Sequence, residues 1–430
     1  MPDVQSMLRL IESAKMQTTF AGLYGSETAI LREQTRRYET LLQKYREYFS
    51  DGDLHLFSTP GRIEIGGNHT DHNAGKVLAA GVNPDSAAGA AATDNRQVTV
   101  YSEGYPQPFK VNLDDLEVQE KEKGTTTALI RGIAARLKKL NYRIGGFNAV
   151  ISGRVLSGSG LSSSASIEVL LGTIFNRLFN ENKISAETLA LAGQYAENVH
   201  FGKPCGLMDQ LTCAVGGIVA VDFADTAHPL FERVSFNFAP QHYKVLVIDT
   251  GGSHAGLTDE YAAIPDEMKS VAKFFNRDVL RRVEKEEVIA NLSPLRKKTG
   301  DRALLRSLHF FAENERVDRQ VKALRQNNFV EFLELVKESG DSSWKWLQNC
   351  YTGKAPHEQG ITLALSLTED FLQTNYILGS CRVHGGGFAG TILVFMPENS
   401  VQLYRRFIEK IFGERSVLSL DVRSSGTVSL

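Results

Sequence analysis

A run of glycines and hydroxyl side chains, Gly158 to Ser166, lies between a β-like segment and a helical one. Residues 147–155 form an extended run, and apolar residues then recur at helical spacing from Ile167 to Leu178. The first N–H groups of a helix lack partners within it and favour negative charge, while glycine lets the backbone approach an anion closely. The pattern predicts a phosphate-binding loop, with a serine-rich helix cap as the alternative.

Two common classes of phosphate-binding protein are excluded because their motifs are missing from the sequence. No lysine follows its glycines, so it does not match the G-x-x-x-x-G-K-[ST] pattern of P-loop NTPases. The H-R-D and D-F-G triplets of protein kinases do not occur in the chain either. We therefore expect a phosphate site of another kind.

A second polar cluster spans residues 59–73 and holds Arg62, His69, Asp71 and His72 within a turn-rich segment. Imidazoles, amides and carboxylates offer complementary donors and acceptors to sugar hydroxyls, whereas arginine suits phosphate or carboxylate. A metal site made of His69, Asp71 and His72 is the competing functional interpretation. A polar turn with local side-chain hydrogen bonds is the structural alternative.

Two further segments carry residues that need partners or close contacts. Asp209 lies among apolar neighbours, where an unpaired carboxylate is costly, so we expect a cationic partner and propose Arg62. A helix-capping role for Asp209 is the alternative. The glycines between Gly385 and Gly390 would let the backbone approach a ligand or another loop, although a tight turn accounts for them equally well.

The elements that must position these residues indicate two α+β domains. A chain of 430 residues is too long for one compact core, and the shift to short strands and turns near residues 216–229 suggests domains of 1–220 and 221–430. The pattern predicts helical structure over Met1–Phe49, a helix over Thr127–Leu140, and another that is capped by Ser185 and runs to about His200. The apolar run at residues 245–248 predicts a strand buried on both faces.

Composition excludes several classes of partner. The formal net charge of -2, with 42% hydrophobic and 23% charged residues, gives no electrostatic case for nucleic acid or an anionic membrane. We therefore expect a protein that acts on small molecules, and we expect it to be a monomer. There is no long apolar run and no signal-peptide pattern at the N-terminus, so we expect it to be cytoplasmic. Its four scattered cysteines predict reduced thiols rather than disulfides or a zinc site.

Three segments, taken in order along the chain, resemble the three motifs of the GHMP small-molecule kinases. They are P-G-R near residue 60, G-L-S-S-S-A-S near 160 and G-G-G-F-A-G near 385. Within that superfamily the chain is most similar to galactokinase. Residues 60–73 resemble its P-G-R-x-N-x-I-G-E-H-T-D-Y-N signature, and residues 204–210 its P-C-G-I-M-D-Q segment. His254, Leu257 and Tyr261 also match family positions, the last a sugar-contacting tyrosine.

The resemblance implies a two-domain α+β fold with an N-terminal domain of the ribosomal protein S5 domain 2-like type, a C-terminal ferredoxin-like domain and a site between them. It implies a sugar 1-kinase that uses ATP and Mg²⁺ to convert galactose to galactose 1-phosphate. The site residues that it implies are Asp209 and Arg62 for catalysis; Asn68, His69, Asp71, Gly206 and Tyr261 for the sugar; Gly158, Ser159, Gly160, Leu161, Ser162, Ser163 and Ser164 for the nucleotide; and Ser164 and Glu197 for magnesium.

Departures from the galactokinase signature leave the substrate open. The family's asparagine, glutamate and tyrosine are replaced here by Glu64, Asn68 and His72. An amide donates as well as accepts hydrogen bonds, so Asn68 changes the pattern of hydroxyl groups that this position can recognise. A kinase for another sugar or a uronic acid, and a non-catalytic sugar sensor, are the alternatives to a galactokinase.

Overall fold

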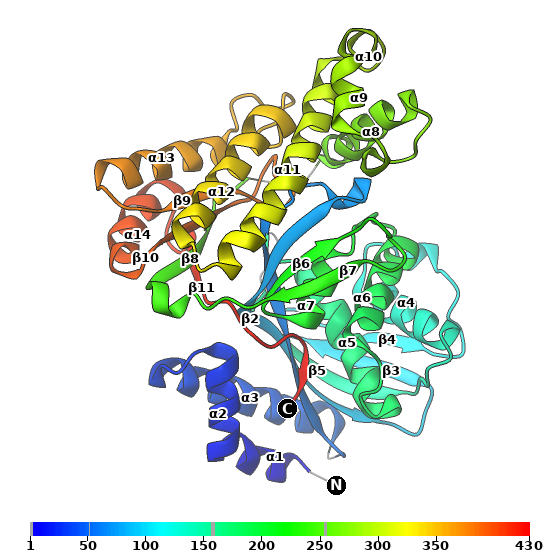
Figure 1. Cartoon of the computed structure of the whole chain (residues 1–430). Helices are drawn as coiled ribbons and strands as arrows, with labels where there is room; N and C mark the ends of the chain where they lie inside the picture. The colour runs from blue at the N-terminus through cyan, green and yellow to red at the C-terminus, as the bar shows by residue number, and fades with distance from the viewer. Residues whose placement is uncertain (1–2, 51, 156–159, 253–255) are drawn as a thin grey trace.

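The structure is a computed structural model that describes residues 3–50, 52–155, 160–252 and 256–430. Within these ranges the strands form one sheet of eight strands and one of four, and helices cover both (Figure 1). Strands and helices are mixed along the chain without strict alternation. The predicted α+β class is therefore confirmed.

The larger sheet is built on a long antiparallel pair, β1 and β2, which is buried along most of its length. Two register shifts bend this pair on either side of Arg62. Because of the bend, residues 86–92 of β2 pair with β5 while residues 76–80 pair with β6. The strands of this sheet are β1 (His55–Gly66), β2 (Lys76–Ala92), β3 (Gln97–Ser102), β4 (Phe109–Asn112), β5 (Phe147–Gly153), β6 (Ile218–Asp222), β7 (Leu230–Val234) and β12 (Val428–Ser429).

Helices cover both faces of the larger sheet (Figure 1). Most of the helices that follow β4 and β5 in the chain pack their apolar residues on one face, around Phe147 and Ile151. The last of them, residues 208–215, packs beside this cluster, against Val77 and Ala79 of β2. The N-terminal helices pack on the other face, around Leu56 and Val150. The N-terminal helices are α1 (Val4–Ile11), α2 (Ala14–Tyr24) and α3 (Thr28–Phe49), and the helices of the opposite face are α4 (Thr126–Lys139), α5 (Ser163–Asn180), α6 (Ala186–Tyr195), the π-helical η3 (Ala196–Phe201) and α7 (Met208–Val215).

The smaller sheet is antiparallel, in the order β11-β8-β10-β9. Along β8 the side chains alternate: Val245 and Val247 face the core shared with the larger sheet, whereas Leu246 and Ile248 face the helices outside. This alternation confirms the predicted strand buried on both faces. Its strands are β8 (Tyr243–Asp249), β9 (Ser380–His384), β10 (Thr391–Pro397) and β11 (Val417–Leu420), and its outer helices are α13 (Gly360–Thr374) and α14 (Glu398–Phe412).

A group of helices between β8 and β9 joins the two sheets and extends beyond them at the top of Figure 1. The C-terminal half of α11 packs with α12 in the core between the sheets, and its N-terminal half packs against α8 and α10. The helices of this group are α8 (Thr258–Phe274), α9 (Lys285–Ala290), α10 (Leu292–Thr299), α11 (Asp301–Arg325), α12 (Phe329–Ser342) and the π-helical η6 (Ser343–Leu347). Short 3-10 turns are η1 (Asp71–Asn73), η2 (Glu120–Glu122), η4 (Ala239–Gln241) and η5 (Leu280–Arg282).

Most of the predicted elements are present, with two differences. Ser185 caps α6 through its side chain, as predicted, but the helix ends at Tyr195 and continues as the π-helical turn η3. The N-terminal segment, predicted to be helical, is divided into three helices, because Ser13 caps the second and Gly25 ends it with a φ of 107°. The predicted domain boundary between residues 220 and 221 stays a prediction. β7 follows this boundary in the chain and pairs with β6 of the larger sheet.

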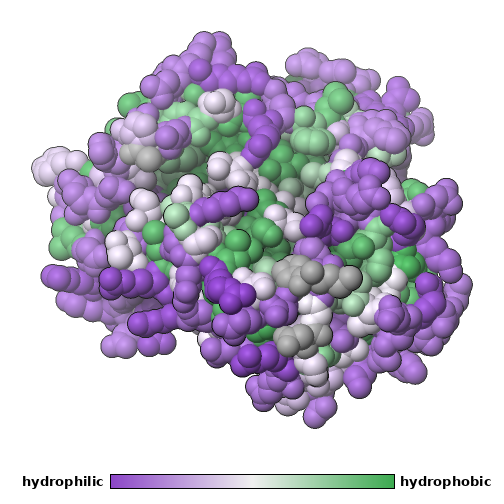
Figure 2. All heavy atoms as spheres, turned by 90° about the horizontal axis from the view of Figure 1, so that it is seen from below, coloured by the Kyte–Doolittle hydropathy of each residue, from purple (hydrophilic) through white to green (hydrophobic). Residues whose placement is uncertain are grey.

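The surface and the cysteines were the subject of expectations drawn from composition. The face seen from below is mostly hydrophilic, with apolar atoms gathered in its hollows (Figure 2). No helix in the described ranges is long and apolar enough to cross a membrane. All four cysteines lie in the described part of the chain and are free thiols, as predicted.

Candidate active site

Asp209 and Arg62 form a two-pronged ion pair. Asp209 lies in the first turn of α7 and Arg62 in the middle of β1. Nε of Arg62 is 2.7 Å from Oδ1 of Asp209, and Nη2 is 2.7 Å from Oδ2. Burial by itself raises the pKa of Asp209, but the charge and hydrogen bonds of Arg62 outweigh it and hold the pKa below its ordinary value. Asp209 is therefore an ionised carboxylate held in a fixed orientation.

The predicted phosphate-binding loop, residues 158–164, is called the serine loop below. Its described part, which begins at Gly160, is hydrogen-bonded to this ion pair. Arg62 donates through Nη1 to the carbonyl oxygen of Gly160 and through its backbone N–H to that of Leu161, the latter at 3.0 Å. The Ser162 hydroxyl donates to Oδ2 of Asp209 at 2.6 Å. Since β5 ends at Gly153 and α5 begins at Ser163, the loop lies at the predicted junction of strand and helix.

The loop is also held from the side of the smaller sheet. A Cβ atom added to Gly160 would lie only 2.6 Å from Nδ1 of His384, on β9. The backbone N–H of Glu64 donates to Nε2 of the same histidine at 3.3 Å. His384 therefore packs at the meeting point of β1, β9 and the loop. Gly158 and Ser159, also predicted to bind nucleotide, lie outside the described residues.

A buried acidic group adjoins the start of α5. The Ser164 hydroxyl donates to Oε1 of Glu197 at 3.2 Å, and Nζ of Lys203 is 3.2 Å from the same oxygen. The side-chain amide of Gln210 donates to Glu197 at 3.0 Å and to Glu168 at 2.9 Å. Because Gln210 follows Asp209 directly, these bonds connect the acidic group to the ion pair.

The donor set of this acidic group fits magnesium. Mg²⁺ binds oxygen and usually keeps waters and phosphate oxygens besides one or two protein ligands, so the Ser164 hydroxyl and the Glu197 carboxylate are suitable partners. Among the described residues, no group of three or more His, Cys, Asp and Glu side chains could hold a metal ion alone. The alternative metal site at His69, Asp71 and His72, all of them described, is therefore not supported.

Residues 60–73, which resemble the galactokinase signature, are called the signature segment below. This segment faces a loop of the C-terminal half, Gly385–Gly387, which we call the glycine loop. Nε2 of His69 is 2.9 Å from the carbonyl oxygen of Gly386, and the Tyr261 hydroxyl donates to that of Gly387 at 2.8 Å. Burial lowers the pKa of His69 to about 4, so the ring is neutral at pH 7 and its Nε2–H is the donor. His69 and Tyr261 thus meet at one loop, although 192 positions separate them in sequence.

Asp71 and Gly206 are also in contact. A Cβ atom added to Gly206 would lie 1.7 Å from Oδ2 of Asp71, so any other residue at this position would displace the Asp71 carboxylate. Oδ1 of Asp71 accepts the backbone N–H of His72 at 2.9 Å. The structure thus brings the signature segment against the turn that leads to Asp209. His254, another matched position, lies outside the described residues.

Asn68 is placed differently from the other predicted sugar-binding residues. Its side chain is fully buried and is hydrogen-bonded on both its nitrogen and its oxygen by protein groups. The structure therefore does not support direct contact between Asn68 and a sugar, because the amide has no free hydrogen-bond donor or acceptor. Glu64 stands where the signature has asparagine, and it is buried beside Asn68. It is paired with Arg382, whose Nη2 is 2.9 Å from Oε1 of Glu64.

Three residues of this region were not predicted from the sequence. Glu168 is fully buried beside Glu197, and burial together with the charge of Glu197 raises its pKa well above the ordinary value. Lys203 and His384 contact the predicted residues from neighbouring turns and strands. The sequence held one signal for Glu168. This residue is a carboxylate within the apolar helical pattern that follows the serines, where an unpaired charge would be costly.

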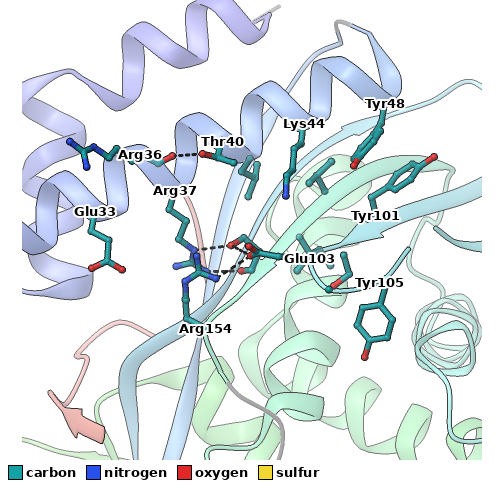
Figure 3. A pocket seen from close by; sticks show the side chains of 16 residues that line it. Glu33, Arg36, Arg37, Thr40, Lys44, Tyr48, Tyr101, Glu103, Tyr105 and Arg154 are labelled. Atoms are coloured by element: carbon teal, nitrogen blue, oxygen red, sulfur yellow. Dashed lines mark hydrogen bonds and ion pairs between the residues drawn. The ribbon is translucent and has the colours of Figure 1, made fainter. Parts of the chain in front are cut away.

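A separate cavity of about 330 Å³ lies between α3 and the strands β3 and β5. Figure 3 shows Lys44 and Glu103 directed into it and the rings of Tyr48 and Tyr101 stacked at its edge, with centroids 3.9 Å apart. None of the described site residues lines it. The cavity is therefore distinct from the site around Asp209.

Two families match parts of the chain. Residues 128–217 match the GHMP kinases N terminal domain, and residues 43–92 match the galactokinase galactose-binding signature. The first match contains the serine loop and Asp209, and the second contains Arg62 and the signature segment. The ion pair of Asp209 and Arg62 thus joins the two matched regions.

Solved structures extend the likeness to most of the chain. Galactokinase from Lactococcus lactis, complexed with galactose, is 25% identical with a TM-score of 0.78, and the alignment covers 92% of this chain and 100% of that one. Mevalonate kinase from Methanococcus jannaschii has 15% identity and a TM-score of 0.60, covering 85% and 98%. Phosphomevalonate kinase from Streptococcus pneumoniae has 13% identity and a TM-score of 0.57, covering 88% and 99%. The last two likenesses concern the fold alone.

Proposed function

Because this chain belongs to the GHMP kinase superfamily and carries the galactokinase galactose-binding signature, we propose that it is an ATP-dependent sugar 1-kinase. Its reaction transfers the γ-phosphoryl group of ATP to the anomeric hydroxyl of a monosaccharide, with galactose as the first candidate. The observation that carries the proposal is the ion pair of Asp209 and Arg62, hydrogen-bonded directly to the serine loop.

Phosphoryl transfer requires mainly that a hydroxyl be aligned with the phosphate and that the developing charge be neutralised. The ionised carboxylate of Asp209 accepts the hydrogen bond of the anomeric hydroxyl and orients its oxygen. Since its pKa is low, Asp209 is a weak base, and orientation is its larger contribution. Arg62 holds this carboxylate and places positive charge beside the loop that receives the phosphates.

The nucleotide lies along the serine loop in this proposal. The first N–H groups of α5 point toward the loop, where they favour the charge of the phosphates. Ser164 and Glu197 would hold Mg²⁺, which when bound neutralises phosphate charge. Lys203, which is paired with Glu197, keeps that carboxylate in position.

The sugar lies between the signature segment and the turn at Gly206. Asp71 is the principal acceptor for its hydroxyl groups, while His69 and Tyr261 close the site from the side of the glycine loop. The relative from Lactococcus lactis was solved with galactose, which supports this placement. A different sugar or a uronic acid is the second candidate, favoured by Asn68 and Glu64 in place of the signature's glutamate and asparagine.

The test is a coupled ADP-release assay with Mg-ATP and a panel of free monosaccharides, including galactose, other hexoses, pentoses and uronic acids. We expect turnover on one member, abolished in Asp209→Asn and unchanged in Asp318→Asn, a matched substitution at an exposed surface ion pair. Turnover on another sugar that exceeds turnover on galactose would select the second candidate. Sugar binding without ADP release on any member would refute the kinase and favour a sensor.

A further inference from the structure

The glycine loop receives a hydrogen bond from another segment of the chain at each of its three carbonyl groups. Asn68 donates to the first through Nδ2 at 2.9 Å, His69 to the second through Nε2 at 2.9 Å, and Tyr261 to the third through its hydroxyl at 2.8 Å. Two of these donors come from the signature segment after β1. The loop between β9 and β10 is therefore fastened to the segment predicted to bind the sugar.

Asn68 uses its whole hydrogen-bonding capacity within the protein. A carboxamide has two donor hydrogens and two acceptor positions. Its Nδ2 donates to Oε1 of Glu64 at 2.8 Å and to the carbonyl oxygen of Gly385 at 2.9 Å. Its Oδ1 accepts from Nδ2 of Asn349 at 2.8 Å and from the Ser343 hydroxyl at 3.3 Å. With the side chain fully buried, no position is left for a ligand.

The exchange of residues at positions 64 and 68 makes this arrangement possible. Both groups that receive the Nδ2 hydrogens of Asn68, the Glu64 carboxylate and the Gly385 carbonyl, are acceptors. A glutamate at position 68, as in the galactokinase signature, would place a third acceptor against them. The bond to the glycine loop therefore requires an amide here, while Arg382 neutralises the carboxylate at position 64.

The glycine loop can occupy this position only because its residues are small. Gly387 has a φ of 78°, and a Cβ atom added to it would lie 2.1 Å from the carbonyl oxygen of Asn349. A Cβ atom added to Gly386 would lie 2.7 Å from Cε1 of Tyr261. The loop is thus pressed against Tyr261 on one side and Asn349 on the other, so a shift of the loop would also move Tyr261.

We propose that Asn68 is a positioning residue, which fastens the glycine loop to the signature segment and thereby places His69 and Tyr261 at the sugar without contacting the sugar itself. The expected effect on sugar binding rests on the proposed function, whereas the expected effect on the glycine loop does not. Loss of the Asn68 amide should release the loop and weaken sugar binding more than it slows turnover.

Asn68→Asp tests this, because it keeps the size of the side chain and removes both donor hydrogens. The matched control is Asn176→Asp, another buried asparagine whose amide donates to a backbone carbonyl, that of Ile184, at 3.0 Å. Hydrogen–deuterium exchange of the peptide over residues 385–390 and the KM and kcat for the sugar are measured for both, besides their melting temperatures.

We expect Asn68→Asp to raise exchange in the glycine loop and the sugar KM at least tenfold each, with kcat changed less than threefold. Asn176→Asp should lower the melting temperature without either effect.

Unchanged exchange in the glycine loop of Asn68→Asp would overturn the proposal, as would a rise equal to that in Asn176→Asp. An unchanged KM in a variant with a released loop would overturn its kinetic part. If the wild-type protein phosphorylates no sugar, the proposed function fails, and the exchange measurement on the unliganded protein still decides whether Asn68 holds the loop.

Discussion

Arg62→Lys is the substitution that tests the geometry of the site most directly. Lysine keeps the positive charge but presents a single ammonium group, whereas the arginine makes three side-chain hydrogen bonds, two with Asp209 and one with the carbonyl of Gly160. Lysine can retain one of them. The variant thus separates the role of the charge from the role of the fixed orientation.

The size of the effect follows from the two lost bonds. A hydrogen bond to a charged group contributes about 1.5 to 3 kcal/mol net, and the lower value applies here because the Asp209 side chain is 30% exposed to solvent. Two such bonds amount to about 3 kcal/mol. Since about 1.4 kcal/mol corresponds to a factor of ten in rate, kcat should fall by about 100-fold if these bonds hold Asp209 and the loop in the reactive arrangement.

The assay is ADP release at saturating ATP and sugar, below the melting temperature of every variant. Arg37→Lys is the matched control, since Arg37 is a buried arginine paired with Asp85 at 2.6 Å, and none of its partners is a predicted site residue. It should lose stability and keep its kcat. A kcat within threefold of wild type in Arg62→Lys, or an equal loss in Arg37→Lys, would refute the reasoning.

Three further predictions concern stability. Between pH 6.5 and 4, His69 alone should lower the free energy of unfolding, measured by urea denaturation, by about 3 kcal/mol. The reason is that the pKa of His69 is about 4 in the folded protein, so the unfolded chain takes up the proton at a higher pH. A free energy of unfolding that stays constant over this range would contradict the prediction. Glu168→Gln should melt no lower than wild type at pH 8, since burial raises the pKa of this carboxyl and ionising it costs stability as pH rises; a drop of several degrees would count against it. Gly387→Ala should cost about 2 to 4 kcal/mol, whereas Gly353→Ala, whose added Cβ meets nothing within 4 Å, should cost under about 1 kcal/mol in the same denaturation experiment.

Several features of the fold could be predicted because they depend on neighbours in the sequence. The change from β-like to helical periodicity located the junction at Gly160 to Ser164, and the hydroxyl of Ser185 marked the start of α6. The partnership of Arg62 and Asp209 was predicted from energetic need, since a carboxylate among apolar residues requires a cation. Local pattern and the cost of burying charge are both readable from residue types.

The role of Asn68 shows where such reasoning ends. Its residue type suggested a sugar contact, but its four hydrogen bonds go to groups up to 317 positions away, and only the packing of β9 and η6 against the signature segment brings them there. The raised pKa of Glu168 likewise depends on its burial beside Glu197. The amino-acid sequence by itself determined which chemical groups are present and which local elements carry them. Tertiary structure decided which of those groups remain available to a ligand, because hydrogen-bonding capacity is consumed by whichever partners the fold places within reach.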